Sequence, residues 1–239
     1  MLPGCGPRRS GRRAVGIRSA LLGSTVLASL SLPAQSQTIV LPEIGNIAAQ
    51  PRQTEPDNSA SEMTFSGQRV VEQPYARPGE FLEITPGLIV TQHSGEGNAN
   101  QYFLRGFNLD HGTDLAIWVD GMPVNMRTHG HGQGYADIAF LIPELIQSMR
   151  VRKGPYFADE GDFSSAGALH IDTIDTLNPG LAQGTLGMFG YGRALAIKSY
   201  AAGAGNLLVA GEGVVYDGPW DVPDRMRKVR ARFDEAILR

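Results

Sequence analysis

The stretch that decides the fold of this chain is residues 101–122, QYFLRGFNLDHGTDLAIWVDGM. Two short apolar runs, Tyr102–Leu104 and Leu115–Val119, flank a polar segment, and each run ends in a charged residue followed by glycine. Short apolar runs rich in aromatic and β-branched residues and bounded by turn residues predict strands. Asp120-Gly121 is expected only to build a turn, because glycine reaches positive φ without steric cost. The residues alone leave open a plain β-hairpin or a more specific domain.

The composition indicates a turn-rich chain with many strands. Its 239 residues allow one or two domains, and its 30 glycines and 15 prolines disfavour a helical bundle. The only cysteine, Cys5, lies in the segment that we expect to be removed after export. The mature protein would then have neither a disulfide framework nor a cysteine metal site.

Residues 1–36 have the three-part layout of a secretory signal peptide. Five arginines and no acid precede an apolar run at 20–32, and Ala34 and Ser36 place small residues at the cleavage positions. The alternative is a membrane anchor, but the run is too short to cross about 30 Å of hydrocarbon. Cleavage makes the net charge of −3 more negative, because those five arginines leave with the signal. Nucleic acid binding calls for a basic face, so we expect no nucleic-acid partner.

Residues 37–64 are expected to be a flexible tether, because the polar, proline-containing sequence at 50–59 cannot bury enough surface to order itself. The tether opens with a β-prone patch of four residues: Thr38, Ile39, Val40 and Leu41. Such a patch can add a strand to the sheet edge of a partner. The alternative is an arbitrary mature N-terminus, and the residues do not decide between the two.

From Met63 onward the sequence alternates short elements with polar loops. The patterns predict a short helix at 79–84, a strand at 88–91, a helix from about Ile142 to Met149 with Pro143 in its first turn, and strands at 150–155 and 166–173. The intervening loops are rich in glycine, asparagine and histidine at 93–100 and 125–134.

After residue 180 the sequence pattern changes: the segments 184–203 and 206–216 are rich in glycine, and their apolar and polar residues nearly alternate. Period-two alternation puts Leu207, Val209 and Val215 on one face and Glu212 and Tyr216 on the other. Two-sided alternation over about ten residues resembles a membrane β-barrel strand, although an ordinary hairpin gives the same pattern. The charged tail at 225–239 fits either a third strand or a short helix.

In their order, these motifs resemble the plug domain of TonB-dependent outer-membrane receptors. The five elements that carry the resemblance are Thr85-Pro86-Gly87-Leu88, Leu104-Arg105-Gly106-Phe107, Ile117–Asn125, Ile146–Pro155 and Ala166–Ile171. The chain departs from the family pattern at Arg150 and Lys153, where the family has Glu and Arg. It departs again at 158–161, where the family often has Tyr-Gly.

The resemblance implies an α+β fold: a small mixed-sheet plug with short helices at 65–178, followed at 179–239 by the first strands of an outer-membrane barrel. Only a few strands of a large plugged barrel could fit there, so we expect a fragment, a truncated reading frame or a degenerate gene product. Thr38–Leu41 resembles the TonB box of these receptors, which implies a TonB-type energy-transducing partner. The implied location is the outer membrane, or the periplasm if the barrel is truly absent.

The implied function is energised uptake of a scarce nutrient such as an iron chelate or a metal, with no enzymatic activity and no resident cofactor. Arg105 at a strand end would pair with a carboxylate on the barrel wall, since a guanidinium suits bidentate contacts; a solvated arginine is the alternative. Ligand contacts would come from two loops, through His93, Asn98, Asn100, Arg127, His129, His131, Gln133 and Tyr135.

Two other functions remain open from the sequence. One is a secreted or periplasmic ligand- or metal-binding module, in which His129 and His131 are weak metal candidates together with His93 or His111, because imidazole suits several transition metals. The other is a metal-dependent hydrolase that adds Asp110 or Asp137 to the two histidines. No nucleophile and base pair supports the hydrolase.

Overall fold

A computed structural model of the chain describes residues 38–40, 61–75, 77, 79–92 and 97–237. The expected signal peptide, most of the expected tether, and Leu41 and His93 lie outside these residues.

The described elements are short helices and many strands. In chain order they are β1 (Thr38–Val40), β2 (Glu62–Ser66), α1 (Gly67–Val71), the 3₁₀ helix η1 (Glu80–Ile84), β3 (Leu88–Thr91), β4 (Gln101–Leu104), β5 (Phe107–Asn108), β6 (Leu115–Val119), β7 (Met122–Pro123), the 3₁₀ helix η2 (Pro143–Leu145), β8 (Ile146–Lys153) and β9 (Gly167–Thr173). The last four are β10 (Leu181–Leu186), β11 (Gly192–Ala202), β12 (Gly205–Tyr216) and β13 (Met226–Ile237).

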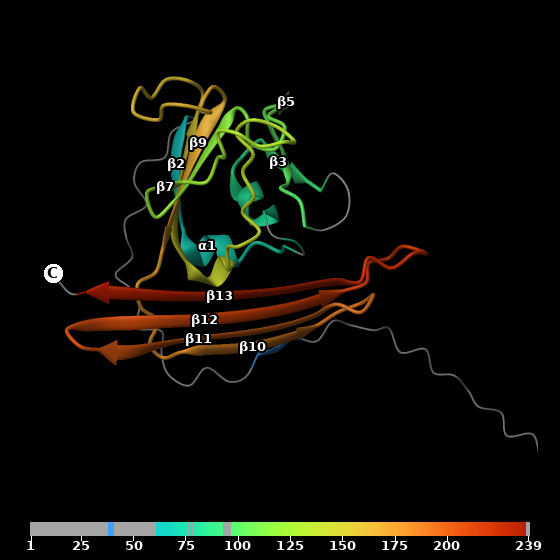
Figure 1. Cartoon of the computed structure of the whole chain (residues 1–239), viewed down its shortest axis with the longest axis vertical. Helices are drawn as coiled ribbons and strands as arrows, with labels where there is room; N and C mark the ends of the chain where they lie inside the picture. The colour runs from blue at the N-terminus through green and yellow to red at the C-terminus, as the bar shows by residue number, and fades with distance from the viewer. Residues whose placement is uncertain (1–37, 41–60, 76, 78, 93–96, 238–239) are drawn as a thin grey trace, which may run out of the picture. The chain divides into compact units, whose positions relative to one another are not determined.

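Residues 62–173 are built on a five-stranded mixed sheet with the order β2-β8-β9-β6-β7 (Figure 1). Strands β6 and β9 run parallel, with Ile117 opposite Leu169, and the other pairs are antiparallel. A parallel pair needs a crossover connection and is normally buried on both faces. Accordingly β6 and β9 are apolar and buried at most positions, which places them at the centre of the sheet.

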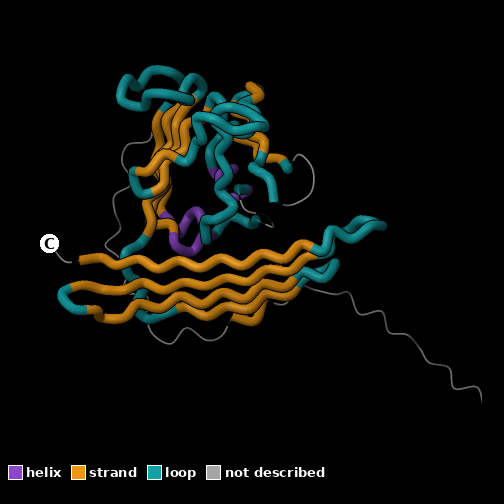
Figure 2. Tube along the Cα trace, in the orientation of Figure 1, coloured by secondary structure: helices purple, strands orange, loops and turns teal. Residues whose placement is uncertain are grey.

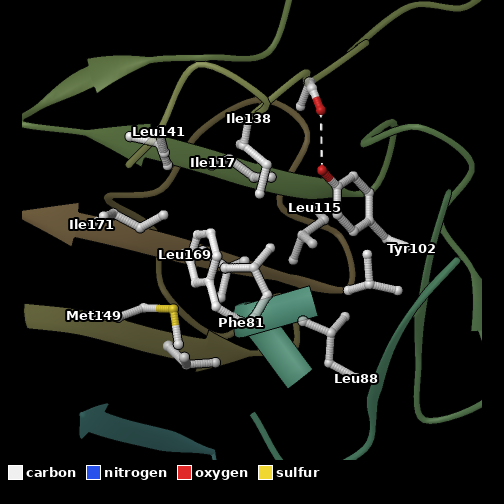
Figure 3. Close-up of a cluster of buried hydrophobic side chains, with 14 of the residues drawn as sticks. Phe81, Leu88, Tyr102, Leu115, Ile117, Ile138, Leu141, Met149, Leu169 and Ile171 are labelled. Atoms are coloured by element: carbon white, nitrogen blue, oxygen red, sulfur yellow. Dashed lines mark hydrogen bonds between the residues drawn. The ribbon is translucent and has the colours of Figure 1, made fainter. Parts of the chain in front are cut away.

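The core of this domain forms where the sheet meets η1. Phe81 and Leu82 of η1 are fully buried, and Figure 3 shows Phe81 among side chains of the central strands, including Leu169 and Met149. A short 3₁₀ helix is a weak element by itself, since its hydrogen-bond geometry is poor. Burial of two large apolar side chains therefore stabilises η1 in place.

Tyr102 of β4 is the one polar member of this core shown in Figure 3. Its ring is fully buried, and its hydroxyl donates a hydrogen bond of 3.1 Å to the carbonyl of Ala136 (Figure 3). Burial raises the pKa of the Tyr102 hydroxyl, with the negative charge of Asp137 acting in the same direction. The hydroxyl therefore stays protonated and ties β4 to the loop before η2.

The two apolar runs of residues 101–122 are strands, as predicted, but they do not form a hairpin with each other. β4 pairs with β3 and β5 in a separate three-stranded sheet, whereas β6 lies in the mixed sheet. The segment between them contains the short strand β5 and turns, with Asp110 at φ 51°. Of the two alternatives left open, the plain hairpin is therefore excluded: ten residues separate the two runs, whereas hairpin loops usually have about two to five.

The predicted helix from Ile142 to Met149 is also wrong in its extent. Only Pro143–Leu145 is helical, as a 3₁₀ turn with the proline at its start, and β8 begins at Ile146. Burial of Met149, Val151 and Lys153 has the period of two that a strand requires. The apolar residues at 142–149 also fit helical spacing, so the pattern was ambiguous until pairing with β2 and β9 decided it.

The C-terminal part of the chain is a long antiparallel sheet with the order β1-β10-β11-β12-β13 (Figures 1 and 2). The charged tail is therefore a strand, β13, rather than a helix. Glu212 is buried, while Val215 on the other face is exposed, as the alternation predicted. The β-prone patch Thr38–Val40 pairs with β10 of its own chain, with Ile39 opposite Gly184.

The mixed sheet with short helices, followed by this antiparallel sheet, confirms the expected α+β fold class. β2 begins at Glu62, slightly before the expected domain start at residue 65. None of the helices among the described residues has both the length and the apolar character needed to cross a membrane.

A substitution at Gly67 tests the close packing of α1 against β8. It follows the N-cap Ser66, and a Cβ atom at Gly67 would lie 1.8 Å from the carbonyl oxygen of Ile146, a backbone atom of β8. We expect Gly67→Ala to lower the free energy of unfolding by about 2–3 kcal/mol, because α1 would have to separate from β8. Gly130→Ala is the matched control, since a Cβ atom there meets nothing within 4 Å. Urea denaturation would measure both, and equal stability of the two variants would contradict the close packing.

Candidate functional site

Three loops of the plug-like domain meet around Tyr135. The hydroxyl of Tyr135 accepts a hydrogen bond of 2.7 Å from the backbone N–H of Ala99, and its ring lies 5.6 Å from the ring of His111. The backbone N–H of Ala136 donates to the carbonyl of His111 at 2.8 Å. Segments 97–101, 108–113 and 126–136 therefore form one cluster, in which the two predicted ligand loops lie beside the segment around residue 110.

Asn125 is the cross-link of this cluster. Its side-chain nitrogen lies 2.9–3.0 Å from the carbonyls of Gly112, Leu115 and Gly134, and its side-chain oxygen accepts from the N–H of Ile117. An amide that satisfies this many backbone groups fixes the loops relative to β6, because each unmade bond would leave a polar group without a partner. Nothing in the sequence pattern singles out Asn125 for this role, although it follows the Asp120-Gly121 turn closely.

The side chains of Asp110, His111 and His131 come together at this cluster. Their ligand atoms all lie within 4.8 Å of one another. His111 Nε2 lies 3.7 Å from Asp110 Oδ1, and the rings of His111 and His131 pack edge to face with centroids 4.6 Å apart. His111 is buried, whereas His131 is exposed.

His129 is not part of this group. Its ring stacks on Tyr135 with centroids 3.9 Å apart, and its Nδ1 accepts a hydrogen bond from the N–H of His131. Asp137 also lies outside the group and accepts from the backbone N–H of Ala139. The expected pair His129 and His131 is therefore split by the structure, and His111 with Asp110 stands beside His131 instead.

The remaining predicted ligand residues are placed as follows. Asn100 is buried, and its carbonyl faces His111 Nδ1 at 3.1 Å, so it is a scaffold residue in this structure. Asn98, Arg127 and Gln133 are exposed. Arg127 lies 3.9 Å from Asp162, and both side chains are largely in solvent, so this ion pair contributes little.

A second functional feature is a buried ion network between the domain of residues 62–173 and the long antiparallel sheet. Glu144 of η2 forms a bidentate pair with Arg193 of β11 at 2.6 and 2.7 Å. Arg193 and Arg230 of β13 both donate to Glu212 of β12. The side chains of all four residues are 8% exposed or less.

Further hydrogen bonds and an apolar cluster surround this ion network. Arg230 also donates to the carbonyl of Leu141 at 2.8 Å, and the hydroxyl of Tyr75 donates to Glu144 at 3.2 Å. Beside it, an apolar cluster combines plug and sheet side chains, namely Ile142, Leu145, Leu195, Ile197, Leu208 and Ala210. Burial raises the pKa of the Tyr75 hydroxyl, and the charge of Glu144 adds to that effect, so Tyr75 remains a donor.

Asp120 does more than build its turn. It sits at φ 49°, and its carboxylate accepts hydrogen bonds from the backbone N–H and the hydroxyl of Thr173 at 2.8–2.9 Å. It also pairs with Arg232 of β13 at 3.0 Å. The expectation that Asp120 only forms a turn was therefore too narrow, because its partners lie 53 and 112 residues away in the chain.

Arg105 lies at the end of β4, exposed and at φ 53°. It stands near Lys153, which is buried and donates to the carbonyl of Pro86 at 2.9 Å. Burial lowers the pKa of Lys153, and the positive charge of Arg105 lowers it further.

Residues 55–168 match the family model described as the TonB-dependent Receptor Plug Domain. This match covers the three loops and most of the mixed sheet, so that part of the chain is similar to a TonB-dependent receptor plug domain.

Several individual proteins are similar to parts of this chain. The vitamin B12 transporter BtuB of Vibrio vulnificus (strain YJ016) is 30% identical over 95 residues, which are 40% of this chain and 14% of that protein. Among solved structures, the copper transporter OprC has a TM-score of 0.52 at 20% identity, covering 67% of this chain and 24% of that one. The ferric enterobactin receptor PfeA has a TM-score of 0.51 at 18% identity, covering 67% and 25%. The chain thus spans about a quarter or less of the length of these relatives.

The ion network predicts a large effect of Glu144→Gln. Arg193 would lose its bidentate partner while remaining buried, and breaking a buried pair on one side costs about 3–5 kcal/mol. We expect the free energy of unfolding to fall by that amount in urea denaturation, and amide exchange in η2 to become faster. Glu72→Gln is the control, because Glu72 is exposed and contacts Gln68. A double variant Glu144→Leu/Arg193→Leu should cost less than the sum of the single changes; strict additivity would contradict the pairing.

Proposed function

We propose that this chain is the plug and the first membrane strands of a TonB-dependent outer-membrane receptor, which takes up a scarce nutrient with energy supplied from the inner membrane. The observation that carries the proposal is the joining of a plug domain to strands of 11–12 residues by a buried ion network. A tilted transmembrane strand needs about 9–11 residues. The expected export by a signal peptide at 1–36 belongs to the same proposal.

The outward face of the long sheet supports a membrane location. This face lies opposite the face that carries Leu195, Leu208 and Glu212, and its exposed side chains are mostly apolar or small. Examples are Leu186, Ala194, Ala196, Tyr200, Val215, Val229, Ala231 and Phe233. The inward face carries the buried arginines and Glu212. Apolar-out and polar-in alternation is the pattern of membrane β-barrel strands.

A TonB-type protein is the proposed partner, and the segment Thr38–Leu41 is its proposed binding site. β1 already adopts strand geometry and pairs along the edge of β10. A segment that adds to one sheet edge can add to the sheet of another protein in the same way, with main-chain hydrogen bonds supplying the affinity.

The nutrient would bind at the loop cluster around Tyr135. Relatives of this fold are named as transporters or receptors for vitamin B12, copper and ferric enterobactin. A small molecule or metal of that kind is the proposed cargo. Arg105, next to the buried Lys153, is the proposed contact for a carboxylate on the wall of the surrounding barrel.

A valine pair tests the membrane location. Val229 lies on the outward face of β13, whereas Val222 lies in the loop before it, and both are at least four-fifths exposed. We expect the purified chain to float with phospholipid vesicles and Val229→Arg to weaken this binding by up to about 2–4 kcal/mol. Val222→Arg should leave it unchanged. A chain that stays in the soluble fraction, or equal losses in the two variants, would argue against membrane strands.

A proline substitution tests the partner site. Proline has no N–H to donate, so Ile39→Pro should lower binding to the periplasmic domain of a TonB-type protein from the same organism at least tenfold. Gln53→Pro, in the polar part of the expected tether, should bind as the unchanged chain does. Calorimetry with the purified domain measures both. If Ile39→Pro bound with unchanged affinity, Thr38–Leu41 would not be the binding site for the TonB-type protein.

A further inference from the structure

Asp110, His111 and His131 offer two imidazoles and a carboxylate at one point of the loop cluster. Two histidines with one carboxylate hold Zn²⁺ in open sites, where a fourth position is left for another ligand. Ligand atoms about 2.1 Å from a tetrahedral ion lie roughly 3.4 Å apart. The distance of 3.7 Å between His111 Nε2 and Asp110 Oδ1 is close to that value.

His111 is oriented as a metal ligand would be. Its side chain is 5% exposed, and its Nδ1 lies 2.9 Å from the carbonyl of Ala99 and 3.1 Å from that of Asn100. A carbonyl oxygen can only accept, so Nδ1 must carry the proton. In the neutral ring the lone pair is then on Nε2, the atom that faces Asp110. A backbone carbonyl that fixes the tautomer in this way is the usual outer partner of a metal-bound histidine.

The other two ligands are held near His111 by the loops that carry them. The N–H of Asp110 donates to Asn108 Oδ1 and its carbonyl accepts from Tyr102, both at 2.9 Å. The loop that carries His131 approaches so closely that a Cβ atom at Gly132 would lie 3.3 Å from Asp110 Oδ2. His131 is exposed, so its ring can turn to complete the set.

We propose that Asp110, His111 and His131 bind a divalent transition-metal ion such as Zn²⁺, as cargo. The assignment of the ion as cargo rests on the proposed receptor function. The Asp110 side chain is half exposed and His131 is open to solvent, so an ion can enter and leave. A structural zinc site would instead have four protein ligands. His129, stacked on Tyr135, serves the loop and not the ion.

Calorimetric titration of the purified, tag-free full chain with ZnCl₂ at neutral pH tests the site. We expect one ion per chain, with affinity lowered at least tenfold in Asp110→Asn and in His131→Ala. His129→Ala and Asp162→Asn are matched controls, one an exposed loop histidine and the other an exposed loop aspartate, and both should bind within about twofold of the unchanged chain. Asp110→Asn keeps the shape of the side chain, and circular dichroism should give the same melting temperature, which separates loss of a ligand from loss of fold.

Three results would overturn the site: no Zn²⁺ binding by the unchanged chain, full binding by Asp110→Asn, or a loss in His129→Ala equal to that in His131→Ala. The vesicle and partner experiments report on the receptor function separately. If these succeed and Zn²⁺ does not bind, only the metal inference fails. If Zn²⁺ binds at this site but the chain associates neither with vesicles nor with the TonB-type domain, the cargo role is overturned.

Discussion

The buried network of Glu144, Arg193, Glu212 and Arg230 is the interaction on which the arrangement of this molecule depends. Charges taken out of water are tolerated only when each has a partner of opposite sign and its remaining hydrogen-bonding capacity is met. η2 supplies one carboxylate of this set, and three neighbouring strands supply the rest. The domain of residues 62–173 and the long sheet therefore each supply charges that the other needs as partners.

The ligand loops depend on a different kind of constraint. Asn125, Tyr135 and the buried Tyr102 connect the loops to β4 and β6 through neutral hydrogen bonds to backbone groups. Neutral bonds of this kind hold geometry without the desolvation cost of charge, so the loops can present Asp110 and His131 to solvent from a rigid base. A binding site on loops needs such a base, because loops alone are mobile.

Most of the strands and the family of the plug could be predicted from residues 101–122 and the motifs around them. The errors came where one pattern fits two structures. Apolar residues at 142–149 satisfy both helical and strand spacing, and the two runs of 101–122 look like a hairpin until their partners β3 and β9 are known. For the candidate site, the sequence favoured His129 and His131 as metal ligands, together with His93 or His111. The structure brings together His111 and Asp110 with His131, since ring stacking turns His129 toward Tyr135.

The sequence by itself determined where most of the strands lie and which faces of the last strands are apolar, because periodicity and turn chemistry are local properties. The order of its motifs carries the resemblance to a receptor plug domain. Only the tertiary structure decided which strands are neighbours, and that Glu144 and Asp120 form ion pairs with arginines of the long sheet. Each of those depends on residues tens of positions apart, and no local pattern encodes which distant charge a buried carboxylate will meet.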